Sequence, residues 1–195
     1  MTATKTTTTT TTDRKEDAAA TKKYVGSGVI LTRMPPVGAG MEQARFLLLL
    51  GQETGVWSFP KGHPEMRDRG VPLRTAVRET YEETGYLAGQ HYQIVGDSLR
   101  FGKRPYWIGV MNETGPVPAP RIQEEEHSIA GWFTLAEAAG LNSNTDVRAW
   151  LKKAALPTSG FARTLLVLPR LVLTQPPVSS STLPTNSSVP VCNGS

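Results

Sequence analysis

Three glutamates and an arginine on one predicted helix are the residues in this sequence best suited to chemistry. Glu79, Glu82 and Glu83 are spaced i, i+3 and i+4, and Arg78 directly precedes them. An α-helix turns by about 100° per residue, so this spacing places the three carboxylates on one arc. The residues on the opposite arc are expected to face the core: Leu73, Ala76, Val77 and Thr80.

This acidic arc is unfavourable for the helix unless cations offset it. The three carboxylates repel one another, and they lie toward the C-terminal end, where the helix dipole already disfavours negative charge. Arg78 supplies one cation, four residues before Glu82. A hard divalent metal would be the other, since magnesium binds carboxylate oxygens together with substrate phosphates. A solvated helix face is the alternative interpretation of the triplet taken alone.

The surrounding residues resemble the Nudix box, whose pattern is G-x5-E-x7-R-E-U-x-E-E-x-G-U, where U is a bulky apolar residue. Residues 78–86 read RETYEETGY and match its second half at every charged and glycine position. Residues 59–65 read FPKGHPE and resemble the lead-in common in the family, especially in its dinucleoside tetraphosphatase branch. The resemblance implies the Nudix fold, an α/β/α sandwich with a mixed β-sheet between helices.

The match departs from the pattern in three places. Thr80 stands where the family favours an aliphatic residue, and the first glutamate of the pattern falls on Asp68. Fifteen residues separate Gly62 from Arg78, against thirteen in the pattern, so two are inserted. We expect the insertion near residues 68–71, where Gly70 can absorb a turn. It leaves the role of Asp68 open.

The resemblance assigns a role to each matching residue. It implies that Glu79, Glu82 and Glu83 bind magnesium, for which manganese could substitute, and that the Gly62 carbonyl is a further ligand. Glu79 would bind the metal or act as an acid–base residue, and Arg78 would orient a glutamate. The implied reaction is attack of a metal-activated water on phosphorus.

Some family members place the general base in a later loop, and this sequence has an acidic loop before His127. Glu125 and Glu126 are the candidates there, next to Glu124. A solvated acidic loop is the alternative interpretation. His127 is as compatible with packing or with orienting a neighbour as with catalysis.

Substrate-binding candidates come from two regions. The first is the lead-in, with Lys61, His63 and Glu65. The second is a predicted hairpin whose cations could bind phosphates and whose aromatic residue could stack on a base: Arg100, Lys103, Arg104 and Tyr106. Surface solvation of the cations and core packing of the aromatic ring are the alternatives.

The function expected from the resemblance is hydrolysis of a phosphoanhydride bond in a nucleoside diphosphate-linked substrate, foremost a dinucleoside polyphosphate. Removal of the 5′ cap from messenger RNA is an alternative, since decapping members share the F-P-K-G lead-in and the basic arm could contact RNA. Diphosphoinositol polyphosphates are another alternative. A catalytically silent nucleotide sensor would usually lack the metal glutamates, all of which are present here.

The elements that must position these residues form an α+β domain at residues 23–156. Apolar runs predict strands at 24–32, 46–50, 92–101, 106–111 and 130–133. Pro72 in the first turn and Gly85 after the last turn bound a helix within residues 71–84. Thr134 and Glu137 form a capping box for a short helix that ends at Gly140, and a last helix is expected at 144–155.

Both ends of the 195-residue chain have biased composition. Residues 1–22 form a Thr-rich basic arm and residues 157–195 a Pro/Ser/Thr-rich tail, both expected to be disordered apart from a candidate strand at 165–173. A single cysteine, Cys192, excludes an intramolecular disulfide and fits a reducing compartment, cytoplasmic or nuclear. No apolar run is long enough to cross a membrane. The net charge of +4 is compatible with a polyanionic substrate.

Overall fold

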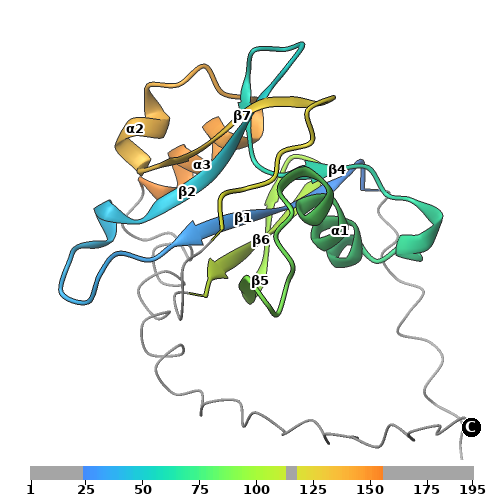
Figure 1. Ribbon diagram of the computed structural model, residues 1–195, viewed down its shortest axis with the longest axis horizontal. Helices are drawn as coiled ribbons and strands as arrows, with labels where there is room; N and C mark the ends of the chain where they lie inside the picture. Colours follow the sequence, from blue (N-terminus) through green and yellow to red (C-terminus); the bar gives the residue numbers. More distant parts are fainter. Residues whose placement is uncertain (1–23, 113–117, 156–195) are drawn as a thin grey trace, which may run out of the picture.

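The computed structural model describes residues 24–112 and 118–155. Within these described residues, seven strands and three α-helices follow one another, with two short 3₁₀ turns between them (Figure 1). The elements are β1 (Ser27–Arg33), η1 (Met41–Gln43), β2 (Arg45–Gly51), β3 (Trp57–Ser58), β4 (Lys61–Gly62), η2 (Met66–Asp68), α1 (Pro72–Thr84), β5 (Tyr92–Phe101), β6 (Arg104–Met111), β7 (His127–Phe133), α2 (Leu135–Ala139) and α3 (Thr145–Ala154).

One mixed sheet organises the domain. The strand order is β3-β2-β1-β6-β5, and β7 pairs with β2 along its other edge. Among the strands of the described residues, only the β1–β6 pair is parallel. β1 and β2 pair with each other only near Thr32 and Phe46. Beyond that point β3 pairs with the end of β2, and β4 pairs with the start of β1. The chain from Trp57 to Gly62 is therefore held between two strands that separate.

Helices cover both faces of this sheet, as Figure 1 shows. Along β1, Ile30 packs in the core shared with α2 and α3, whereas Val29 and Leu31 pack in the core shared with α1. This alternation follows from the two-residue period of a strand. Since both faces are buried, the central strands read as continuous apolar runs. The expected α+β sandwich, with a mixed sheet between helices, is confirmed.

The caps expected from the sequence are present at α1 and α2, and α3 has a side-chain cap as well. Pro72 occupies the first turn of α1, and Gly85 ends it in the left-handed region at φ 73°. Thr134 and Glu137 form the capping box of α2, and the Asn144 side chain accepts from Val147 N at the start of α3. These side chains satisfy helix-end groups that would otherwise lack partners.

The buried face of α1 differs from the expected one. Thr75, Ala76, Thr80, Glu83 and Thr84 are buried, while Leu73 and Val77 are only half-buried. Glu83 therefore lies toward the protein interior and is just 2% exposed, although the helical pattern put it on the arc opposite the core. Its partners Lys61 N on β4 and His127 on β7 make this burial possible.

Several features expected from the sequence lie outside the described residues. They are the arm at 1–22, the tail at 157–195 and the candidate strand at 165–173 within that tail. Within residues 24–112 and 118–155, no helix combines the length and apolar character needed to cross a bilayer. The structure adds the two-residue strands β3 and β4, which the sequence pattern did not predict.

Candidate active site

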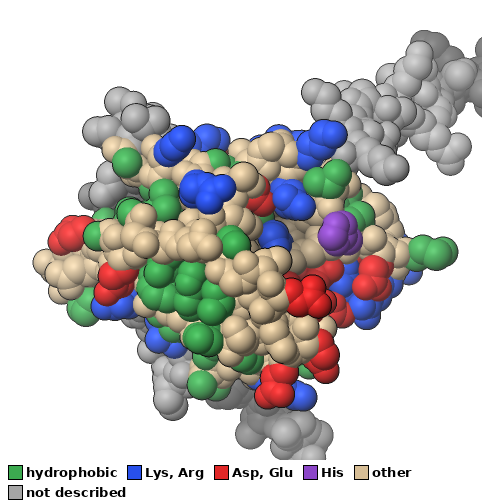
Figure 2. Space-filling model, turned by 90° about the horizontal axis from the view of Figure 1, so that it is seen from above, with side chains coloured by type: hydrophobic (Ala, Val, Ile, Leu, Met, Phe, Trp, Pro, Cys, Tyr) green, Lys and Arg blue, Asp and Glu red, His purple; other side chains and the backbone are tan. Residues whose placement is uncertain are grey.

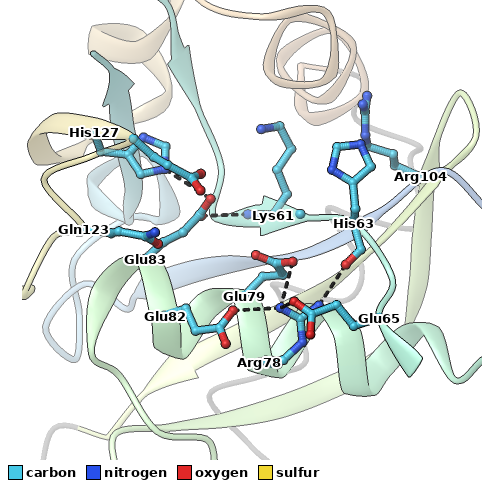
Figure 3. Close-up of a pocket in the computed structure, with 12 residues that line it drawn as sticks. Lys61, His63, Glu65, Arg78, Glu79, Glu82, Glu83, Arg104, Gln123 and His127 are labelled. Carbon is cyan, nitrogen blue, oxygen red and sulfur yellow. Dashed lines mark hydrogen bonds and ion pairs between the residues drawn. The ribbon is translucent and has the colours of Figure 1, made fainter. Parts of the chain in front are cut away.

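A cavity of about 750 Å3 opens where α1 meets the β4 segment and the turn before β7. Figure 3 shows Glu79 and Glu83 pointing from α1 toward Lys61, with Arg104 and His63 on the other side of the cavity. Ten of the residues singled out in the sequence line it: Lys61, Gly62, His63, Glu65, Arg78, Glu79, Glu82, Glu83, Arg104 and Glu126. The remaining two are Gln123 and His127.

The split in the sheet brings the lead-in residues over α1. β4 pairs with β1 through Gly62 and Lys61, which fixes the path of this segment. Lys61 N donates to Glu83 Oε2 at 2.9 Å. A Cβ added at Gly62 would clash with the Glu79 carboxyl group, so only glycine allows that carboxylate to lie against the backbone. The β4 backbone and the helix carboxylates are thus in direct contact.

Arg78 is the centre of an ion-pair network that links α1 to the preceding loop. Its Nη1 lies 2.9 Å from Glu79 Oε1 and 2.7 Å from Glu82 Oε2, and its Nη2 donates to the His63 carbonyl at 2.8 Å. Arg67 contacts the other oxygen of Glu82, Oε1, at 2.7 Å. These cations counter the carboxylate repulsion expected for the helix.

Asp68 anchors this network from the loop with the two-residue insertion. It is 2% exposed, and it accepts hydrogen bonds from Arg78, from the Glu65 backbone and from the Thr75 hydroxyl. The Arg78 hydrogen bond is the main reason that the pKa of Asp68 is lowered to about 2. Asp68 does not line the cavity, so it orients Arg78 from outside the cavity lining.

Glu79 has a different environment from that of Asp68. It is partly buried beside Gly62, and this burial raises its pKa above the ordinary value, while the nearby Arg78 opposes the rise. Burial disfavours the charged form of a carboxyl group. A further cation bound in the cavity would therefore favour the ionised form of Glu79.

The buried Glu83 links α1 to His127, the first residue of β7, directly after the turn at residues 124–126. His127 Nε2 lies 3.1 Å from Glu83 Oε1, and His127 is itself only 6% exposed. Ligand atoms of Glu83, Glu126 and His127 all lie within 4.8 Å of one another. Gln123 lines the same cavity from the start of this turn, and its sequence position carried no signal.

Four predicted site residues are placed elsewhere by the fold. Glu125 lines a neighbouring cavity, while Arg100 and Lys103 are exposed and do not line the site cavity. Tyr106 is fully buried, and its hydroxyl donates to Asp146 Oδ2 at 2.7 Å. Burial raises the pKa of Tyr106, and the adjacent Asp146 adds to this effect. A buried ring held from α3 is not available for stacking on a base.

The family model described as the NUDIX domain matches residues 33–154, which include every residue of the cavity. The chain belongs to the NUDIX family.

Curated relatives bear the name asymmetrical bis(5′-nucleosyl)-tetraphosphatase. This Nudix protein is 31% identical to the one from Sus scrofa over 136 residues, which is 65% of this chain and 89% of the relative. It is also 31% identical to the one from Rattus norvegicus over 116 residues, covering 54% and 76% respectively. The protein is thus a Nudix hydrolase, in the class that acts on acid anhydrides.

Two solved structures show the same fold. A C. elegans Ap4A hydrolase in a binary complex superposes with a TM-score of 0.53 and 23% identity, covering 71% of this chain and 98% of that one. The NUDIX domain of Shewanella oneidensis NrtR, complexed with ADP ribose, gives a TM-score of 0.50 and 17% identity, covering 72% and 92%. At these identities the likeness concerns the fold.

The donor set of this Nudix domain suits a divalent cation. Five of the cavity residues are glutamates and three are lysine or arginine, so carboxylates outnumber fixed cations. Hard divalent metals bind carboxylate and carbonyl oxygens, and histidine is a common ligand for softer ones. The group Glu83, Glu126 and His127 could hold such an ion. Without one, an anionic phosphate chain would meet an excess of like charge.

Proposed function

We propose that this Nudix hydrolase cleaves dinucleoside polyphosphates, using magnesium held by the carboxylates of α1. The observation that carries the proposal is that Glu79, Glu82 and Glu83 line one cavity with the Lys61–Gly62 strand, where the metal ligands and the phosphate-binding groups must meet. The names of the curated relatives, at 31% identity over most of their length, support this substrate class.

The cavity separates binding groups of opposite charge. Glu79, Glu82 and Glu83 rise from α1, whereas the side chains of Lys61 and Arg104 lie across the cavity from them (Figure 3). Figure 2 shows basic and acidic side chains and a histidine close together on one face of the domain. Lys61 and Arg104 can bind phosphate oxygens, and Glu79, Glu82, Glu83 and the Gly62 carbonyl would hold the metal.

A bound divalent cation would neutralise charge on the phosphates and activate water for attack. The chain then has to accept a proton and guide the attack. Glu126 stands beside Glu83 and His127, with its carboxylate open to solvent. We assign Glu126 as the general base: it takes the proton of the attacking water as the new P–O bond forms and the anhydride P–O bond breaks. Arg78 keeps the α1 carboxylates in place.

A substrate comparison with magnesium present tests the proposal. Diadenosine tetraphosphate, capped RNA and a diphosphoinositol polyphosphate are supplied side by side, and the products are separated by ion-exchange chromatography. We expect mono- and triphosphate nucleotides from the first substrate at the highest kcat/KM. Turnover of capped RNA alone, or of the inositol substrate alone, would replace the proposed substrate class by that one.

A variant tests the assignment of the base. Glu126→Gln should lower kcat by about 100-fold or more, the usual effect of losing a general base, with little change in KM. Glu53→Gln, an exposed glutamate outside the linings of both cavities, is the matched control for the catalytic step. A Glu126→Gln enzyme with the kcat of the wild type would remove Glu126 from the mechanism.

A further inference from the structure

A second cavity of about 450 Å3 lies directly beside the site, between the end of α1 and the chain before β7. Glu82 and Gln123 belong to the linings of both cavities, so the two cavities adjoin. The residues that line the second one alone are Tyr81, Gly85, Arg121, Ile122, Glu124 and Glu125. A substrate bound at the α1 carboxylates could therefore extend into it.

The walls of this second cavity are fixed by backbone contacts. Arg121 N donates to the Thr84 carbonyl at 2.9 Å, which ties the loop to the last turn of α1. Gly85 permits this close approach, because a Cβ there would lie 3.2 Å from Arg121 Cβ and its φ is 73°. At the other end of the turn, Gln52 N donates to the Glu126 carbonyl at 2.9 Å. The cavity is therefore preformed.

Tyr81 gives this cavity a feature that the first one lacks. Its side chain is 49% exposed at the end of α1. No Phe, Tyr or Trp is among the described residues that line the first cavity. Nucleobases stack on aromatic rings and on arginine guanidinium planes. Arg121 is exposed, and its side chain has no hydrogen-bond or ion-pair partner among residues 24–112 and 118–155.

The polar groups of the cavity are hydrogen-bond acceptors. Glu124 and Glu125 are exposed, and within the described part of the chain their carboxylates have no hydrogen-bond or ion-pair partner. Ionised carboxylates only accept hydrogen bonds, and the C-terminal end of a helix adds partial negative charge. Guanine presents N1–H and N2–H2 donors side by side on its Watson–Crick edge. Adenine presents an acceptor at N1, which a carboxylate would repel.

We propose that this second cavity binds the nucleobase of the substrate half remote from the cleaved bond, and that it prefers guanine to adenine. The base stacks on Tyr81, with Arg121 against it, while Glu124 or Glu125 accepts hydrogen bonds from its donor edge. This assignment rests on the proposed hydrolysis of dinucleoside polyphosphates. It gives Glu125 a binding role in place of the catalytic one expected from the sequence.

Steady-state kinetics with diguanosine and diadenosine tetraphosphates test the proposal. We expect the wild type to have the higher kcat/KM with the guanosine substrate. Tyr81→Leu should lower kcat/KM for both substrates by about tenfold, through loss of stacking. Tyr81→Phe should restore the wild-type value. The double variant Glu124→Gln, Glu125→Gln should remove the preference for guanine. Ile129→Ala, an exposed apolar residue outside both cavities, is the control.

Binding without metal separates failure of this subsite from failure of the proposed reaction. Saturation-transfer NMR is recorded with guanosine and with adenosine, which have no phosphates for the first cavity. Stronger transfer to guanosine, lost in Tyr81→Leu, would support the subsite even if neither tetraphosphate were hydrolysed. Equal kcat/KM for the wild type and Tyr81→Leu with a substrate that the wild type hydrolyses, or transfer unaffected by Tyr81→Leu, would overturn it. Equal kcat/KM for the two substrates in the wild type would overturn the guanine preference.

Discussion

Asp68 and Arg78 form a two-point ion pair that joins the inserted loop to the catalytic helix. Arg78 Nε lies 3.1 Å from Asp68 Oδ1, and Arg78 Nη2 lies 3.0 Å from Asp68 Oδ2. Such parallel contacts fix the orientation of a guanidinium group. The remaining Arg78 nitrogen then contacts Glu79 and Glu82, so the loop determines where these carboxylates lie. The structure thereby gives Asp68 a role that the sequence left open.

Asp68→Asn should destabilise the fold at neutral pH. The pKa of Asp68 falls from 3.8 to about 2 in the folded state, so its ionised form contributes stability above pH 3.8. A shift of this size corresponds to about 2 kcal/mol. The contribution is lost as the pH falls through the folded pKa. We expect the difference in unfolding free energy between wild type and variant, measured with urea, to shrink by about half at pH 3.

A stability difference that stayed constant between pH 7 and pH 3 would contradict the ion-pair role of Asp68. Asp97→Asn is the matched control, because Asp97 is exposed on β5 and forms no hydrogen bond or ion pair within the described residues. This control should change the unfolding free energy little at either pH.

Glu83→Gln should remove most activity while preserving the fold. The glutamine oxygen can still accept from Lys61 N, so the contact between β4 and α1 is kept. The lost negative charge removes a metal ligand, and we expect kcat/KM to fall by about 100-fold or more, since losing even an outer partner of a metal ligand costs 10–100-fold. Magnesium titration by isothermal calorimetry should show weaker binding.

The control for that variant is Glu53→Gln, an exposed glutamate of the β2–β3 loop outside both cavities. Its magnesium affinity and turnover should match the wild type. Glu83→Gln with wild-type turnover and magnesium affinity would remove Glu83 from the metal site.

Gly62→Ala should disturb the site by displacing the Glu79 carboxyl group. The added Cβ would meet the Glu79 carboxyl group, which lies at the end of a flexible side chain and can be displaced without unfolding the domain. We expect a loss of about tenfold or more in kcat/KM, because misplacing a catalytic group by about 1 Å can cost 100-fold, with a nearly unchanged melting temperature. Gly140→Ala is the control, since its nearest contact would be 3.6 Å away. Full activity in Gly62→Ala would show that Glu79 need not lie against this backbone.

Asp146→Asn should weaken phosphate binding by releasing Arg104. Asp146 Oδ2 lies 3.4 Å from Arg104 Nη1, and the Arg104 side chain is one-third exposed. Partly exposed pairs contribute about 0.2–1 kcal/mol, so KM should rise about twofold to fivefold while kcat stays unchanged. Tyr106→Phe is the control: it removes the hydrogen bond from Tyr106 to Asp146 but leaves the ion pair with Arg104 in place. It separates the loss of the Arg104 pair from the loss of the Tyr106 contact. A fall in kcat without a change in KM would contradict the positioning role.

Helix ends and long strands were predictable because residues within a few positions of one another determine them. Pro72 and Gly85 bound α1 as expected, and β5 spans the predicted residues 92–101. Capping by Thr134 and Asn144 also follows from side chains that hydrogen-bond to backbone a few residues away. The strands β3 and β4 were not predictable, because two residues are too few to show a periodic pattern. They also depend on the separation of β1 from β2, which leaves the edges of these strands free to pair with them.

Site residues on α1 and in the lead-in were predictable, whereas those at other elements were only partly so. Spacing along one helix places Glu79, Glu82 and Glu83 on one arc, but the pattern could not show that Glu83 is buried beneath His127. No feature of the sequence favoured one of the three hairpin cations as a phosphate-binding residue. The fold turns Arg104 toward the cavity and leaves Arg100 and Lys103 outside its lining.

The sequence by itself determined the family, the catalytic helix and the carboxylates on it, because a motif and a helical period depend on neighbours within a few residues. Only the tertiary structure decided how the three glutamates before β7 are divided, with Glu126 in the first cavity and Glu124 and Glu125 in the second. That division depends on hydrogen bonds from Arg121 to Thr84 and from Gln52 to Glu126, across 37 and 74 positions of the chain. Contacts at such separations exist only once the sheet has assembled.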